Sequence, residues 1–287
     1  MRALKKVINA QQAQDGDGVN IHRLAGRHLH PVLNPFLMID EINSDDAADY
    51  IGGFPSHPHR GFETITYMKA GRMRHRDHMG NEGVIGPGDV QWMTAAAGVL
   101  HSEMPEQEHG LLHGFQIWLN LPAAEKMKPA AYQELTSTTL TELQLHMGGL
   151  LRVIAGKVTV NKQLLVGPLA EASTQPVLLD IKMAANESID LSFNADNQAN
   201  VYVYSGETES IAKRQLGIFG RGKNLILKAG PKGAELLVLS GRPIDEPLVQ
   251  YGPFVMNTKE EIEQALKDFQ NPQFLESLRS QRAQKTH

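Results

Sequence analysis

The chain has 287 residues, of which 41% are hydrophobic and 21% are charged, and its formal net charge is −4. This composition is ordinary for a globular protein of one or two domains, and the charge argues against a nucleic-acid-binding surface. Because cysteine is absent, disulfides, thiolate metal sites and cysteine nucleophiles are excluded. No apolar run approaches the length of a membrane span, and no apolar segment follows the N-terminus, so we expect a cytoplasmic protein.

Short apolar or alternating runs, bounded by glycine, proline and asparagine, recur along the chain, among them FLMIDEI, ETITYMKAG, HGFQIWLN, LRVIAGKVTV and ELLVLSG. Such spacing predicts an all-β sandwich or barrel. Helical signals are confined mainly to the end of the chain, where Thr258 and Glu261 fit a capping box and Asn271-Pro272 ends the helical pattern. The alanine- and proline-rich LPAAEKMKPAAYQEL separates two predicted domains, residues 1–130 and 131–287.

The stretch SHPHRGFETITYMKAG contains two histidines, His57 and His59, separated by one residue. Side chains of a strand alternate between its two faces, so both histidines are expected on one face. Glu63 joins them if the strand continues regularly. Three ligand-type groups on one face indicate a metal site.

A second pair, His101 and Glu103, stands in GVLHSEMP and is also separated by one residue. Three histidines and one carboxylate suit a borderline divalent metal such as iron and leave positions open for a substrate or dioxygen. Alternation alone does not decide whether Glu63 or Glu103 is the carboxylate. ANVYVYSGE in the second half weakly repeats ETITYMKAG without the ligands, and no histidine occurs between His146 and His287, so the first half should hold the metal.

The remaining histidines have simpler interpretations. His28 and His30 are taken as structural, and His75 and His78 are predicted to flank an exposed hairpin. His113 begins a strand and should at most support the site from outside. Four further side chains are predicted core residues, some of which could line a pocket for an aromatic ligand: Trp92, Met93, Phe115 and Trp118.

The motifs HPHRGFETITY, GDVQWMTAAAGVLHSEMP and VQYGPFVMNTKEEIEQA resemble the pirin family of the cupin superfamily. The resemblance implies a bicupin: two stacked antiparallel β-barrels of jelly-roll type with a short C-terminal helical segment. It also implies one mononuclear iron, Fe(2+), in the N-terminal barrel, with His57, His59, His101 and Glu103 as ligands. The family pattern favours Glu103 over Glu63 as the carboxylate ligand of the metal. Nickel, copper, manganese or zinc would suit the same donors.

The resemblance also implies an activity, because several pirins are similar to quercetin 2,3-dioxygenases, which open the central ring of a flavonol with dioxygen and release carbon monoxide. Glu103 would then also act as the catalytic base for the flavonol hydroxyl. The alternative is an iron-dependent, redox-sensing regulator that binds a transcription factor or a metabolic enzyme. For that alternative the acidic segment NSDDAADYIGGF is either a partner surface or a solvated lid. The sequence leaves the oligomeric state open, and a monomer is compatible with it.

Overall fold

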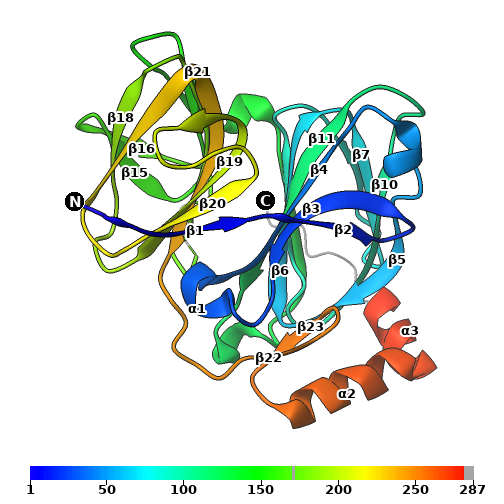
Figure 1. The fold of residues 1–287 in the computed structure, drawn as a ribbon. Helices are drawn as coiled ribbons and strands as arrows, with labels where there is room; N and C mark the ends of the chain where they lie inside the picture. The colour runs from blue at the N-terminus through cyan, green and yellow to red at the C-terminus, as the bar shows by residue number, and fades with distance from the viewer. Residues whose placement is uncertain (170–171, 281–287) are drawn as a thin grey trace. The chain divides into compact units, whose positions relative to one another are not determined.

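The computed structural model describes residues 1–169 and 172–280, which are mostly antiparallel strands (Figure 1). The all-β prediction is therefore confirmed. Contacts divide the chain into two compact units. The first unit comprises Gln12–Ala25, Phe36–Ser137 and the described part of Ile244–His287, and the second comprises Met1–Gln11, Gly26–Pro35 and Thr138–Pro243. Within the described residues, no helix is both long and apolar enough to cross a membrane.

These units differ from the predicted boundary between residues 130 and 131, because strand pairing moves segments across it. β12 (Ala131–Leu135) pairs with β9 (Val90–Thr94) and so belongs to the first unit. At the N-terminus, β1 (Leu4–Asn9) pairs with β20 (Gln215–Phe219) of the second unit. The last residues of the predicted second domain, 281–287, lie outside the described residues.

The first unit contains a seven-stranded sheet and a four-stranded sheet. Its helical turns are η1 (Ala47–Asp49) and η2 (Ala123–Glu125). The seven-stranded sheet runs in the order β12, β9, β6 (Phe62–Ala70), β11 (Leu112–Asn120), β4 (Phe36–Ser44), β3 (Val19–Ala25) and β2 (Gln11–Asp15). The four-stranded sheet runs in the order β5 (Phe54–His59), β10 (Val99–Pro105), β7 (Met73–Asp77) and β8 (Glu82–Ile85).

The second unit is built on one ten-stranded sheet with a hydrophobic core that includes Leu151, Val201 and Leu236. α1 (His30–Leu33) belongs to this unit, and η3 (Ser137–Thr139) lies at its edge. The main path runs β1, β20, β19 (Gln198–Thr208), β21 (Asn224–Gly241), β17 (Val177–Met183), β14 (Leu150–Ala155) and β13 (Thr141–Gln144), with β15 (Lys157–Val160), β16 (Gln163–Val166) and β18 (Ser188–Ser192) beside it.

A break at Arg60 and Gly61 separates β5 from β6 and sends them into different sheets. Gly61 has φ +90°, and a Cβ there would lie 1.9 Å from the Val255 carbonyl oxygen. Only glycine suits this left-handed and crowded position. The strand therefore does not stay regular from His57 to Glu63, so the condition under which Glu63 would share the face of the two histidines is not met.

The C-terminal helices belong to the first unit and follow the short hairpin of β22 (Val249–Tyr251) and β23 (Phe254–Met256) (Figure 1). α2 (Lys259–Gln270) begins with the predicted capping box of Thr258 and Glu261, which is confirmed. α3 (Pro272–Ser280) follows. Arg60 is buried and donates from Nη1 to Asp268 Oδ2 of α2 at 2.7 Å, which ties the helix to the bend after β5.

Lys126, which follows η2, is 1% exposed and holds three segments of the first unit together. Its Nζ donates to the Gly61 carbonyl at 2.6 Å, to Asn120 Oδ1 at 2.6 Å and to the Val255 carbonyl at 3.0 Å. Lys126→Met should lower the free energy of unfolding by roughly 2 to 4 kcal/mol, because three buried acceptors lose their donor. Urea denaturation of the two proteins measures this difference.

The same pair of proteins should differ in the pH dependence of stability. Burial lowers the pKa of Lys126 to about 7, well below the ordinary value near 10.4. Between those values the unfolded chain binds a proton that the folded chain has released, so wild-type stability rises with pH. The free energy of unfolding that Lys126→Met loses relative to the wild type should therefore be larger at pH 9 than at pH 6. An equal loss at both pH values would contradict the lowered pKa of Lys126.

Candidate metal centre

β10 lies between β5 and β7 in the four-stranded sheet and sets the arrangement of the centre. His101 pairs across the strands with His57 on one side and Asp77 on the other, while Glu103 pairs with His75. Directly paired residues in a sheet point to the same face, as do residues two apart in one strand. One face of this sheet therefore carries the histidines and the carboxylates together.

Three of the four predicted ligands lie in one cluster. His57, His59 and His101 each offer a ring nitrogen within 4.8 Å of the others. The Nε2 atoms of His57 and His59 are 3.1 Å apart, and the His57 ring approaches the Pro55 carbonyl oxygen with Nδ1 at 2.8 Å. A proton on that Nδ1 leaves the Nε2 lone pair facing His59, as a metal ligand requires.

Burial favours the neutral, metal-binding form of two of these histidines. Desolvation lowers the pKa of His59 well below its usual value, and neighbouring His57 adds to the shift. The pKa of His101 is lowered in the same way, first by desolvation and then by the adjacent histidines. His59 and His101 are 3% and 2% exposed, whereas His57 is half-buried and leaves the cluster open on its side.

The donor set fits a bound metal. Both ring nitrogens of His101 are buried without a hydrogen-bond partner among the described residues. Buried polar atoms are rarely left without a partner, and such an exception calls for an explanation. A divalent metal ion coordinated by imidazole nitrogen would supply the missing partner.

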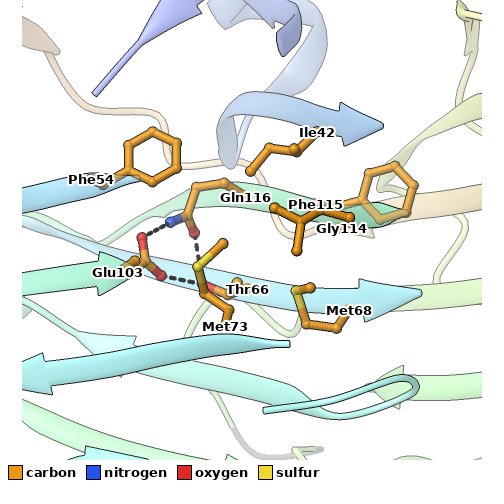
Figure 2. A pocket seen from close by; sticks show the side chains of 10 residues that line it. Ile42, Phe54, Thr66, Met68, Met73, Glu103, Gly114, Phe115 and Gln116 are labelled. Atoms are coloured by element: carbon orange, nitrogen blue, oxygen red, sulfur yellow. Dashed lines mark hydrogen bonds between the residues drawn. The ribbon is translucent and has the colours of Figure 1, made fainter. Parts of the chain in front are cut away.

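Glu103, the fourth predicted ligand, is 2% exposed and held by two side chains from the seven-stranded sheet. Thr66 Oγ1 donates to its Oε1 at 2.7 Å, and Gln116 Nε2 donates to its Oε2 at 2.6 Å. Figure 2 shows this closed triangle of side chains. In this conformation Glu103 belongs to a second group of potential ligands with His75 and His101, all buried and also within 4.8 Å of one another.

A small cavity adjoins the triangle on the side of Ile42, Met68 and Phe115 (Figure 2). Its volume is about 10 Å³, which is enough for roughly one water molecule. A flavonol therefore does not fit there. The exposed part of the histidine cluster lies at the half-buried His57.

Glu63 lies outside both groups. Ile65 and Tyr67, two and four residues further along β6, share its face of the strand, whereas Thr66 points to the opposite face toward Glu103. Glu63 Oε1 accepts a hydrogen bond from Thr94 Oγ1 at 2.6 Å. Burial raises the pKa of Glu63, so this side chain is a buried, hydrogen-bonded carboxyl group away from the histidines.

The prediction of an exposed hairpin is wrong for His75, which is 1% exposed and lies beside His101 and Glu103. A signal was present in the sequence, because alternation in MRHRD places Met73, His75 and Asp77 on one face. The pairing of β7 with β10, which brings that face to the ligands, cannot be read from alternation. Thr66 and Gln116 were missed for the same reason.

The four predicted core residues divide between core and site. Trp92 and Met93 are buried, and Phe115 lines the small cavity. Trp118 is partly exposed and meets the His59 ring edge-on, with centroids 5.2 Å apart. His113 belongs to neither group of potential ligands, and its Nε2 is 3.1 Å from Glu41 Oε1.

Known proteins match this chain along most of its length. The family model described as Pirin matches residues 18–119, and the model described as Pirin C-terminal cupin domain matches residues 178–275. A Vibrio cholerae protein provisionally named a quercetin 2,3-dioxygenase is 46% identical over 93% of this chain and 96% of its own length. Human pirin is 35% identical over 94% of both chains.

Solved structures give the same relation. A crystal structure titled quercetin 2,3-dioxygenase, from Acinetobacter baumannii, matches with a TM-score of 0.86 and 33% identity over 96% of this chain and 98% of its own. The Escherichia coli pirin YhhW, solved in complex with nickel(II), matches in fold with a TM-score of 0.61 at 19% identity, over 85% of this chain and all of its own. With two cupin domains and matches along nearly its whole length, this chain belongs to the pirin family.

Proposed function

We propose that this protein is a mononuclear iron dioxygenase that opens the central ring of a flavonol such as quercetin. The observation that carries the proposal is the cluster of three histidines with converging ring nitrogens, in which buried His101 lacks any partner among the described residues. The similarity to proteins named as quercetin 2,3-dioxygenases supplies the substrate class. His57, His59, His101 and Glu103 are the proposed ligands.

When bound, the iron supplies a Lewis acid for adjacent hydroxyl and carbonyl oxygens and an electron path to dioxygen. The side chains supply the rest. Glu103 accepts the proton of the flavonol hydroxyl, and Thr66 and Gln116 hold its carboxylate in position by their hydrogen bonds. The ring of Trp118, partly exposed beside His59, offers an aromatic face to the substrate on the open side of the cluster.

In the described structure Glu103 is grouped with His101 but not with His57 and His59. To ligate a metal held by all three histidines, the Glu103 side chain would leave Thr66 and Gln116 and turn toward His57 and His59. A carboxylate with two alternative positions, one on the metal and one on its hydrogen-bond donors, suits a group that is both ligand and base.

The regulatory alternative rests on family resemblance, because the acidic segment before β5 is largely engaged within the first unit. Asp49 accepts hydrogen bonds from Asn20 Nδ2 and Ser44 Oγ, both at 2.5 Å, and Asp46 caps η1 by accepting from the Ala48 amide. Tyr50 is buried and donates to the Gly110 carbonyl at 2.8 Å. These contacts hold Asp49, Asp46 and Tyr50 within the first unit.

The proposal is tested by preparing the protein with stoichiometric iron and, separately, after removal of metal with a chelator. Flavonol loss and oxygen consumption are followed together on both samples. We expect the iron-loaded protein to consume both substrates and the metal-free protein to consume neither until iron is restored. Iron-loaded protein that leaves the flavonol untouched would reject this substrate and favour the regulatory alternative.

A further inference from the structure

His75 of β7 is a buried histidine that neither the predicted ligand set nor the proposed mechanism uses. It is 1% exposed, and its register partner across the strands is Glu103. Its ring centroid is 5.4 Å from that of His101. His75 therefore lies against the one histidine whose two ring nitrogens have no partner among the described residues.

The surroundings of His75 orient its ring. Asp77 Oδ2 lies 3.4 Å from His75 Nε2. Asn81 Nδ2 donates to the same Asp77 oxygen at 2.8 Å, which holds the carboxyl group in place. The Tyr132 ring stacks on the face of the His75 ring, with the ring centroids 4.9 Å apart and an angle of 23° between the ring planes. A carboxylate behind one ring nitrogen is the usual support for a histidine that binds metal through the other.

The other nitrogen, His75 Nδ1, is buried without a hydrogen-bond partner in the described part of the chain. One ring nitrogen of His75, one of His101 and one carboxylate oxygen of Glu103 lie within 4.8 Å of one another. Two imidazole nitrogens and one carboxylate oxygen form a donor set suited to borderline divalent transition metals. Hydrogen bonds from Thr66 and Gln116 still leave lone pairs on both carboxylate oxygens.

We propose that His75, His101 and Glu103 form a second metal position, which takes a divalent transition metal ion and has Asp77 as the residue that orients His75. The two positions share His101, so they are alternative locations of one ion, the first facing the half-buried His57 and the second enclosed by buried side chains. The inference rests on the proposed function only in sharing these ligands, and it needs no flavonol turnover.

The test removes the first position and measures what binding remains. The double variant His57→Ala/His59→Ala is freed of metal and titrated with Ni²⁺ against a chromophoric chelator, with circular dichroism to verify folding. We expect the double variant to bind one Ni²⁺ per chain, more weakly than the wild type. Adding His75→Ala should weaken that remaining binding by about tenfold or more. Adding His113→Ala instead, which removes a histidine paired with Glu41 outside both positions, should leave it unchanged.

If the triple variant with His75→Ala does not fold, His75→Gln provides the same comparison with a side chain of similar polarity. A folded double variant that binds no Ni²⁺ would overturn the inference, as would residual binding indifferent to His75. Since none of these measurements uses a flavonol, the second position can be supported while the dioxygenase proposal fails, and the reverse.

Discussion

Replacing His101 by alanine should severely weaken metal binding and, with it, flavonol turnover. His101 is the residue that both groups of potential ligands share, and its ring nitrogens have no other partner among the described residues. We expect the dissociation constant for Fe²⁺ or Ni²⁺ to rise by more than about 100-fold, beyond the effect of losing an outer partner of a ligand. Competition with a chelator and metal analysis after dialysis measure this change.

The matched control is His109→Ala, which removes an exposed histidine from the loop between β10 and β11. It should bind metal like the wild type. His101→Ala leaves no buried hydrogen-bond partner behind, so the variant should remain folded, which circular dichroism can verify. A folded His101→Ala protein with wild-type affinity would refute the assignment of this cluster as the metal centre.

Glu103→Gln should lower the turnover number at saturating iron and flavonol by about 100-fold or more, because the amide cannot accept the hydroxyl proton. The side chain should keep its place: its carbonyl oxygen can accept from Gln116, and its amide can donate to Thr66, whose hydroxyl oxygen also accepts. Steady-state kinetics on samples of equal measured iron content separates this effect from loss of metal.

Glu63→Gln is the matched control, since it makes the same change at a buried carboxyl group on the other face of β6. Glu63 lies outside both groups of potential ligands, and a glutamine carbonyl oxygen there can still accept the hydrogen bond from Thr94. We therefore expect nearly unchanged turnover. Full activity of iron-loaded Glu103→Gln would reject Glu103 as the base, and loss of activity in Glu63→Gln alone would move the role to Glu63.

Local alternation predicted the parts of the site that depend on single strands. His57 with His59, and His101 with Glu103, lie on common faces because each pair stands two residues apart within one strand. The Thr258 capping box was likewise readable, since its signal is confined to one helical turn. These features need no knowledge of which strands are neighbours.

Features that depend on strand pairing could not be predicted in this way. His75 joins the ligands only because β7 pairs with β10 in one register. Glu63 lies away from the ligands because the chain bends at the left-handed Gly61 between β5 and β6. These two strands belong to different sheets. The assignment of β1 and of the C-terminal helices to their units also follows from long-range contacts.

The most direct test of the account is to measure the carbon monoxide formed when the iron-loaded protein consumes a flavonol under air. Ring opening by dioxygen incorporates both oxygen atoms and expels one ring carbon, whereas simple oxidation of the flavonol by iron expels none. We predict one carbon monoxide released for each flavonol and each dioxygen consumed. Flavonol loss without carbon monoxide would contradict the proposed reaction, even if it required iron and His101.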